Sequence, residues 1–195
     1  MKKTLLIATL VICSFAANAQ TQKNTSQTYI DQFKDNAISI MRETGIPASI
    51  ILGIAMHESA NGNSNIAQKL NNQFGFKSSG GSVYYKNKKK VRSSYKKYDS
   101  IMESFADFAR VITQRRDRGA ISSELTETQY EKWVKGIQRS GYASSKKWGA
   151  QVLAIIRKYE LNELDKTAAE TPTPTPVTQQ LAQNASATSA TTDKK

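Results

Sequence analysis

The sequence predicts a mainly α protein of the α+β class, a helical domain with one small β-hairpin. Apolar residues recur at helical spacing in several segments between residues 28 and 159. Residues 83–98 instead place Val and Tyr on either side of a polar tip, which is typical of a hairpin. After residue 164, Thr, Pro, Ala, Gln and Ser dominate, and such a stretch buries too little apolar surface to order itself. We therefore expect one domain at residues 28–164 and a disordered Thr/Pro/Ala-rich tail at residues 165–195.

Residues 1–19 have the features of a secretory signal peptide. Lys2 and Lys3 precede an apolar run, residues 4–16, that is too short to span a bilayer comfortably, and residues 17–19 read Ala-Asn-Ala. We expect cleavage after Ala19, a periplasmic or secreted product, and no stable membrane insertion afterwards. Residues 20–27 are expected to be a flexible lead-in. The single cysteine, Cys13, leaves with the signal peptide, so packing alone must hold the exported chain together.

The formal net charge of +12 favours an anionic partner. Nucleic acid is a common partner of basic proteins, but an export signal argues against it and in favour of anionic cell-wall polymer. The exported chain has one histidine and no cysteine, so no metal-ligand cluster follows from spacing, and no metal or other cofactor is expected. We expect a monomer.

The first helix is expected to begin at a Thr28 cap and to stop at Gly45, after which Pro47 begins a second helix that runs to about Glu58. Ile51 and Ala55 lie on one stripe of this second helix, and the same series reaches Glu58 seven residues after Ile51. Burial favours the neutral form of a carboxyl group, which is the form that a general acid uses. Periodicity alone is equally consistent with a carboxylate that reaches solvent at the helix end.

Ser64 is expected to cap a short helix through Leu70, and residues 78–82, all Ser or Gly, are expected to form a turn or loop. The hairpin follows, with its tip at residues 87–89. Eight of residues 77–97 are Lys or Arg and none is acidic. Asp99 or Ser100 should cap the next helix, which ends at residues 115–119. Two more helices, at about 130–141 and 148–159, place Trp133 and Trp148 on apolar stripes, where we expect them in the core.

Five segments in order resemble the glucosaminidase family of peptidoglycan hydrolases, a lysozyme-like group of glycoside hydrolases. The resemblance covers residues 28–162 and rests on 44–49 (TGIPAS), 57–64 (HESANGNS), 71–77 (NNQFGFK), 98–104 (YDS, then ES) and 141–143 (GYA). It implies a lysozyme-like domain that cleaves peptidoglycan glycan strands after N-acetylglucosamine. Where the family often has Gln and Gly, this chain has Ile54 and Ala60.

The resemblance also implies roles for individual residues. The glutamate of the family's Glu-Ser-x-x-Gly motif corresponds to Glu58, the catalytic acid, and its active-site tyrosine corresponds to Tyr142. Phe74 is implied near the floor of the cleft, where its ring would stack on a sugar. We further expect substrate contacts from Asn72 of the same motif and from two hairpin aromatics, Tyr85 and Tyr95. The lone histidine, His57, points about 100° away from Glu58 around a helix, so we expect it to pack or to face solvent.

The second carboxylate of a typical glycosidase pair is the main departure. Several family members are thought to carry it in the hairpin, and this hairpin has no acid. Asp99, Glu103 and Asp107 are the candidates that follow, although each has a simpler role as a cap or as a charge on an exposed helix face. Alternatively, the 2-acetamido group of the substrate supplies the nucleophile, which is a recognised exception to the two-carboxylate scheme and the account we prefer.

We therefore expect an endo-β-N-acetylglucosaminidase, and no amidohydrolase activity. The alternatives are a muramidase or lytic transglycosylase that acts on the same glycan, or a catalytically inactive module that binds the cell wall without cutting it.

Overall fold

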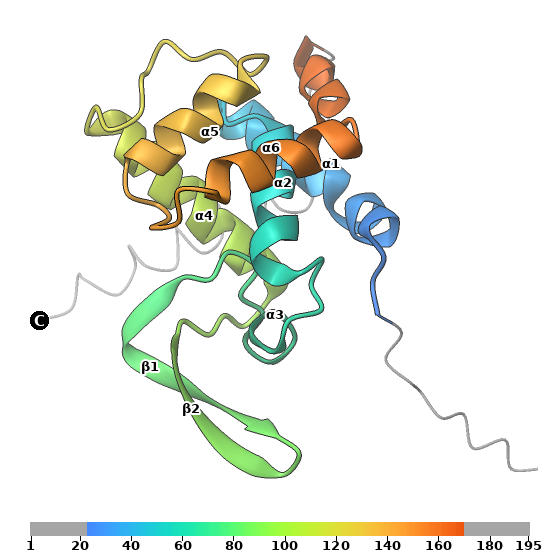
Figure 1. Ribbon diagram of the computed structural model, residues 1–195, viewed down its shortest axis with the longest axis vertical. Coiled ribbons are helices and arrows are strands. Elements are labelled where there is room, and N and C mark those ends of the chain that lie inside the picture. Colours follow the sequence, from blue (N-terminus) through green and yellow to red (C-terminus); the bar gives the residue numbers. More distant parts are fainter. Residues whose placement is uncertain (1–22, 170–195) are drawn as a thin grey trace, which may run out of the picture.

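The computed structural model describes residues 23–169 and shows a bundle of helices from which one β-hairpin projects (Figure 1). The predicted signal peptide and the tail beyond residue 169 lie outside the described residues. The mainly helical α+β prediction is confirmed. No helix among residues 23–169 is long and apolar enough to cross a membrane. In chain order the elements are α1 (Ser26–Thr44), α2 (Ala48–Ser59), α3 (Asn65–Leu70), β1 (Lys77–Lys86), β2 (Lys89–Tyr95), α4 (Ile101–Asp117), α5 (Tyr130–Arg139), α6 (Trp148–Lys158) and the 3-10 helix η1 (Leu161–Ala169).

Helix α2 is the central element of the bundle. It packs against α1, α5, α6 and η1, and every residue from Ala48 to Met56 is buried. The predicted apolar stripe through Ile51 and Ala55 is buried, and neighbouring helices cover the other sides of this helix as well. His57 and Glu58 are the first residues of α2 that are partly exposed. Glu58 meets solvent because it lies where the central helix leaves the core.

Helices α2 and α6, which carry Glu58 and its partner Trp148, pack very closely against each other. A Cβ added at Gly53 would lie 2.7 Å from Cγ1 of Ile156, a separation that real Cβ atoms do not adopt. Only glycine permits this contact between the helices. The end of α2 is fixed by Ser59, whose hydroxyl donates to the carbonyl of Ala55 (2.6 Å) and accepts from the N–H of Gly62 (2.7 Å).

The N-terminal boundary of the domain lies earlier than predicted. Thr25, not Thr28, is the N-cap of α1, and the two threonines form a reciprocal capping box, with Thr28 at the N3 position. Asn24 is also ordered, since its backbone N–H donates to Oδ1 of Asn63 (2.9 Å) and its side chain donates to the carbonyl of Asn61 (3.2 Å). The predicted flexible lead-in therefore overlaps ordered structure from Asn24 onward. The predicted stop at Gly45 is confirmed, with φ of +70°.

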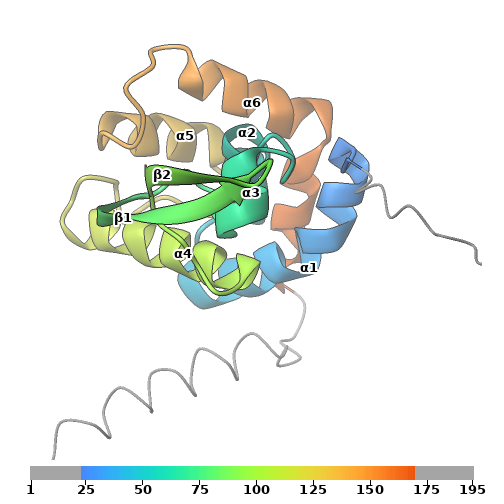
Figure 2. The ribbon, with the colours of Figure 1, turned by 90° about the horizontal axis from the view of Figure 1, so that it is seen from below.

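The hairpin is longer than predicted, because β1 begins at Lys77 and includes the Ser/Gly stretch that was expected to be a loop. Pairing with β2 outweighs the low strand propensity of these residues. The register is irregular between Lys77 and Ser82. Asn87 and Lys88, both with positive φ, form the two-residue tip. Viewed from below, the hairpin crosses in front of α2 and α3, with α5 and α6 on one side and α4 on the other (Figure 2).

The described chain also continues past residue 164, where the tail was predicted to begin. The side chain of Asp165 in η1 is 2% exposed and accepts two hydrogen bonds from Ser49, from the backbone N–H (2.8 Å) and from the hydroxyl (2.6 Å). Ser49 lies in the first turn of α2, and Pro47, the N-cap, makes no side-chain capping bond. Asp165 therefore satisfies donors at the start of the central helix, where a negative charge is also favoured by the helix dipole.

This buried carboxyl predicts a pH-dependent stability. Burial raises the pKa of Asp165 from 3.8 to about 6, against the opposing effect of the bonds from Ser49. The folded state then holds a proton that the unfolded state releases, so the free energy of unfolding falls as pH rises from about 4 through about 6. This change in the pKa of Asp165 alters the free energy of unfolding by at most about 3 kcal/mol between these pH values. Urea unfolding at pH 4.5 and pH 7 should show a smaller pH difference in Asp165→Asn than in the wild type, and equal differences would contradict this.

Candidate active site

A cleft of about 340 Å³ lies where five segments of the chain meet. The end of α2, the loop before β1, the C-terminal part of α4, the α5–α6 loop and the start of α6 all contribute. The lining residues are His57, Glu58, Phe74, Gly75, Phe76, Arg115, Tyr142, Ala143, Ser144, Ser145 and Trp148. The cleft therefore contains both residues that were predicted to be catalytic, Glu58 and Tyr142.

Glu58 is held in one orientation by Trp148. The indole N–H of Trp148 donates to Oε1 of Glu58 at 2.8 Å, and the Trp148 side chain is only 3% exposed. A hydrogen bond from a buried donor to a carboxylate is stronger than one between neutral groups, and the stiff ring limits the rotation of the carboxyl group. Oε1 of Glu58 is therefore engaged in a hydrogen bond within the protein.

The second oxygen, Oε2, lies beside Gly75. A Cβ added at Gly75 would lie 3.6 Å from Oε2, and the backbone of Gly75 has φ of +69°, which side chains rarely adopt. Gly75 therefore brings no side chain to this side of Oε2, where a Cβ would be in van der Waals contact with the oxygen. A substrate atom in the cleft can approach this oxygen directly.

Tyr142 lies on an aromatic cluster at the base of the cleft. Its ring makes edge contacts with Phe76 and Phe108, at centroid separations of 6.1 and 6.0 Å, and a tilted contact with Trp148 at 5.4 Å. Its hydroxyl donates to the carbonyl of Phe74 at 3.2 Å. Burial, and secondarily the charge of Glu58, raises the pKa of Tyr142 well above its ordinary value, so the hydroxyl is neutral at physiological pH.

The side chains of Phe74 and Asn72, which were expected to contact the substrate, are both buried. Phe74 lines the cleft, and its ring is 2% exposed and stacks on Phe108 at 4.2 Å. Asn72 is 1% exposed and donates to the carbonyls of Phe76 (2.9 Å) and Lys96 (2.8 Å). Both residues hold the loop around Gly75 in place. Asn72 satisfies these two backbone carbonyl groups, and Phe74 packs its ring in the core.

The two hairpin tyrosines differ in position. Tyr95 at the end of β2 is partly buried, and its Cε1 would lie 3.9 Å from a Cβ on Gly75, next to Oε2 of Glu58. Tyr85 is 64% exposed and pairs with Lys90. Because Lys90 and Tyr95 are an odd number of residues apart on β2, they face opposite sides of the hairpin. The structure therefore brings Tyr95, and not Tyr85, close to Gly75 on the cleft side where Glu58 lies.

Two of the candidate second acids serve as parts of a helix start. Ser100, one of the two predicted caps, accepts the N–H of Glu103 at 3.1 Å at the N-terminus of α4. The Glu103 carboxylate in turn accepts the N–H of Asp99 at 3.0 Å. Asp99 and Glu103 are both exposed, and neither lines the cleft.

Asp107, the third candidate, is part of a polar cluster at the base of the hairpin. It accepts hydrogen bonds from the Tyr98 hydroxyl (2.7 Å), the Lys96 ammonium (2.9 Å) and the Arg110 guanidinium (2.5 Å). Burial disfavours its ionisation, but these three donors outweigh burial and lower its pKa. Among the described residues that line the cleft, Glu58 is the only acid.

Two residues of the site were missed by the sequence analysis. Trp148 was expected in the core, and it is buried, but its N–H is directed at Glu58. The sequence did contain one indication of this role, because a buried indole N–H needs a hydrogen-bond acceptor. Arg115 was expected only to end a helix. Its guanidinium donates to the Ser140 carbonyl (2.5 Å) and hydroxyl (2.8 Å) and lies 5.9 Å from the centre of the Tyr142 ring.

Comparison with solved structures shows the same fold in several other proteins. A Staphylococcus aureus protein titled N-acetylmuramoyl-L-alanine amidase matches with a TM-score of 0.61 and 20% identity, over 79% of this chain and 46% of that chain. The catalytic domain of the autolysin Auto from Listeria monocytogenes matches with a TM-score of 0.57 and 21% identity, over 75% and 91%. A glycoside hydrolase domain of Salmonella typhimurium FlgJ matches with a TM-score of 0.53 and 21% identity, over 70% and 98%.

Comparison of sequences identifies the family. The exo-glucosaminidase LytG of Bacillus subtilis (strain 168) is 26% identical over 173 residues, which cover 83% of this chain and 61% of LytG. The chain thus spans less than two thirds of this relative. The family model for glucosaminidase, described as mannosyl-glycoprotein endo-beta-N-acetylglucosaminidase, matches residues 34–161, which include every residue that lines the cleft. The chain belongs to the glucosaminidase family of glycoside hydrolases.

Proposed function

We propose that the chain is an exported peptidoglycan hydrolase that cleaves the β-1,4 bond after N-acetylglucosamine, with Glu58 as the general acid. The observation that carries the proposal is the position of Glu58. It is the only acid among the described residues that line the cleft, its Oε1 accepts the indole N–H of Trp148, and its Oε2 lies beside Gly75. Family membership supports the reaction class, and the signal-like residues 1–19 support export.

The proposed reaction begins with proton transfer from Oε2 of Glu58 to the glycosidic oxygen. As the bond from this oxygen to the anomeric carbon breaks, the carbonyl oxygen of the neighbouring 2-acetamido group attacks the anomeric carbon and forms a cyclic oxazolinium ion. Water then opens this ring, and the Glu58 carboxylate accepts the proton of that water. The neutral hydroxyl of Tyr142 assists by orienting the acetamido group or by steadying the developing positive charge.

Substrate assistance is favoured because no described residue lining the cleft, other than Glu58, carries a carboxylate. Asp99 and Glu103 organise the start of α4, and Asp107 is engaged by three donors. A two-carboxylate mechanism would require one of these groups to leave its partners. The acetamido oxygen is already bonded to the reacting sugar, so its attack requires no additional protein group.

The mechanism predicts the stereochemical outcome and the effect of removing the other acids. The newly formed reducing end should retain the β configuration, because two inversions occur at the anomeric carbon. Glu103→Gln and Asp107→Asn should each keep activity within about tenfold of wild type, whereas loss of a general base or nucleophile costs about 10²–10⁴-fold. NMR of the first product formed and initial rates measure both. An α product, or inactivation by either variant in a folded protein, would contradict substrate assistance.

Product analysis separates the proposal from its alternatives. Mass spectrometry of digested peptidoglycan should show N-acetylglucosamine at the new reducing ends. N-acetylmuramic acid ends would instead indicate a muramidase, and 1,6-anhydro ends a lytic transglycosylase. Binding to sacculi without new ends would indicate an inactive module. Early products should be long fragments, since we propose endo cleavage, whereas the name of the LytG relative specifies an exo enzyme; steady release of disaccharides would favour the exo mode.

We also propose that the basic hairpin forms one wall of the substrate-binding region. Of its eight Lys and Arg residues, Lys96 pairs with Asp107, and no other ion pair is formed by the hairpin within residues 23–169. These cations are complementary to the carboxylates of peptidoglycan. Tyr95 is the hairpin residue that we expect to contact a sugar beside Glu58.

A further inference from the structure

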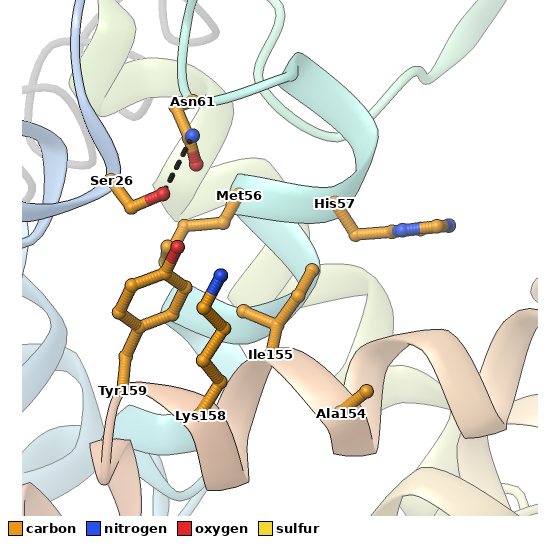
Figure 3. Close-up of a pocket in the computed structure, with 8 residues that line it drawn as sticks. All are labelled: Ser26, Met56, His57, Asn61, Ala154, Ile155, Lys158 and Tyr159. Atoms are coloured by element: carbon orange, nitrogen blue, oxygen red, sulfur yellow. Dashed lines mark hydrogen bonds between the residues drawn. The ribbon is translucent and has the colours of Figure 1, made fainter.

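A second groove, of about 300 Å³, shares His57 with the catalytic cleft. It is built from the first residue of α1, the end of α2 and the C-terminal half of α6 (Figure 3). Its lining residues are Ser26, Met56, His57, Asn61, Ala154, Ile155, Lys158 and Tyr159.

The groove combines an apolar floor with a polar, cationic end. Figure 3 shows Ile155 in the middle, His57 towards one end, and the hydroxyl of Tyr159 beside the amino group of Lys158 at the other. The Lys158 ammonium lies 5.2 Å from the centre of the Tyr159 ring. Asn61 donates to the hydroxyl of Ser26 at 3.0 Å next to this end. None of the eight lining residues is acidic, so the groove is suited to a ligand with a carboxylate and small apolar groups.

We propose that this groove binds the stem peptide that the glycan carries, with its small side chains on the floor formed by Ile155 and Ala154 and a carboxylate at Lys158. The inference rests on the proposed function, because it requires peptidoglycan as the substrate. It adds that the enzyme recognises the peptide as well as the sugars. Glycan that carries its stem peptides is then the preferred substrate.

The distances are suitable for a peptide that extends away from the cleft. Trp148, which holds Glu58, and Lys158 are ten residues apart on α6, and a helix rises about 1.5 Å per residue, so the two are about 15 Å apart along the helix axis. An extended peptide advances about 3.3 Å per residue, so four or five residues span a similar distance. His57 lies at the boundary and would contact the ligand between its two sites.

The test compares two substrates: intact glycan strands, and strands from which an amidase has removed the stem peptides. We expect wild-type kcat/KM to be at least about tenfold higher on intact strands, the order of effect of one well-placed charged contact. Lys158→Met keeps most of the side-chain length and removes the charge, so it should lower this ratio at least about fivefold, mainly through KM. Lys135→Met, an exposed position on α5, is the control for loss of one positive charge.

A second measurement detects binding without catalysis. A soluble stem tetrapeptide titrated into the full exported chain carrying Glu58→Gln should shift the methyl NMR signals of Ile155 and Ala154, and Lys158→Met should weaken this binding. Equal wild-type rates on both substrates, or no methyl shifts, would overturn the peptide site while leaving the proposed function intact. Cleavage of neither substrate would overturn the proposed function itself. The ratio of kcat/KM on intact strands to kcat/KM on peptide-free strands should be lower in Lys158→Met than in Lys135→Met. Equal ratios in the two variants would also contradict the peptide site.

Discussion

Glu58→Gln is expected to lower the rate of glycan cleavage about 10³-fold and to abolish clearing in a peptidoglycan zymogram, within the range known for removal of a general acid. Glutamine has almost the same shape as glutamate but no proton to give to the glycosidic oxygen. Its amide oxygen can still accept the indole N–H of Trp148, which now lies 2.8 Å from the carboxylate. The arrangement of the cleft should therefore persist while the chemistry is lost.

The matched control is Glu103→Gln, which makes the same chemical change at an exposed helix start outside the cleft. Release of reducing ends from sacculi measures the rate, and thermal unfolding shows that both variants are folded. We expect a melting temperature for Glu58→Gln within a few degrees of wild type, since Glu58 is partly exposed. Undiminished clearing by folded Glu58→Gln would remove Glu58 from the reaction.

The sequence was sufficient to place Glu58 at the end of the second helix, but it did not explain why Glu58 is partly exposed there. The motif and the helical spacing both led to this residue. The spacing predicted one apolar stripe, whereas α2 is buried on every side up to Met56. A short helix made almost entirely of apolar residues shows little periodicity, so only its neighbours reveal that it is central.

The side-chain roles around Glu58 could not be predicted from residue type alone. An aromatic ring near a sugar site suggests stacking on the sugar, but the ring of Phe74 stacks on Phe108 and is 2% exposed. Trp148 shows the opposite case, because its apolar stripe correctly placed it in the core while its single polar atom serves the site. Both outcomes depend on contacts between segments more than 30 residues apart, which local patterns do not contain.

Tyr142→Phe should lower kcat about 10- to 100-fold with little change in stability. The ring contacts with Phe76 and Trp148 are kept, and the variant loses only the hydroxyl. That hydroxyl is neutral, because burial and the charge of Glu58 raise its pKa, and it donates to the Phe74 carbonyl next to Gly75. Its loss removes a fixed dipole from the cleft that contains Glu58 and one hydrogen bond to the loop beside Oε2. Removal of one such preorganised donor costs about 10²–10³-fold in a well-studied protease, which sets the upper end.

The kinetic pattern distinguishes a role in the transition state from a role in binding or folding. A group that acts only in the transition state lowers kcat and kcat/KM together and leaves KM unchanged. The control is Tyr130→Phe, which removes a hydroxyl at the start of α5, outside the cleft. A fall in the melting temperature that accounts for the lost activity would indicate that the hydroxyl only holds the loop. Wild-type kcat would show that Glu58 and the substrate complete the reaction without it.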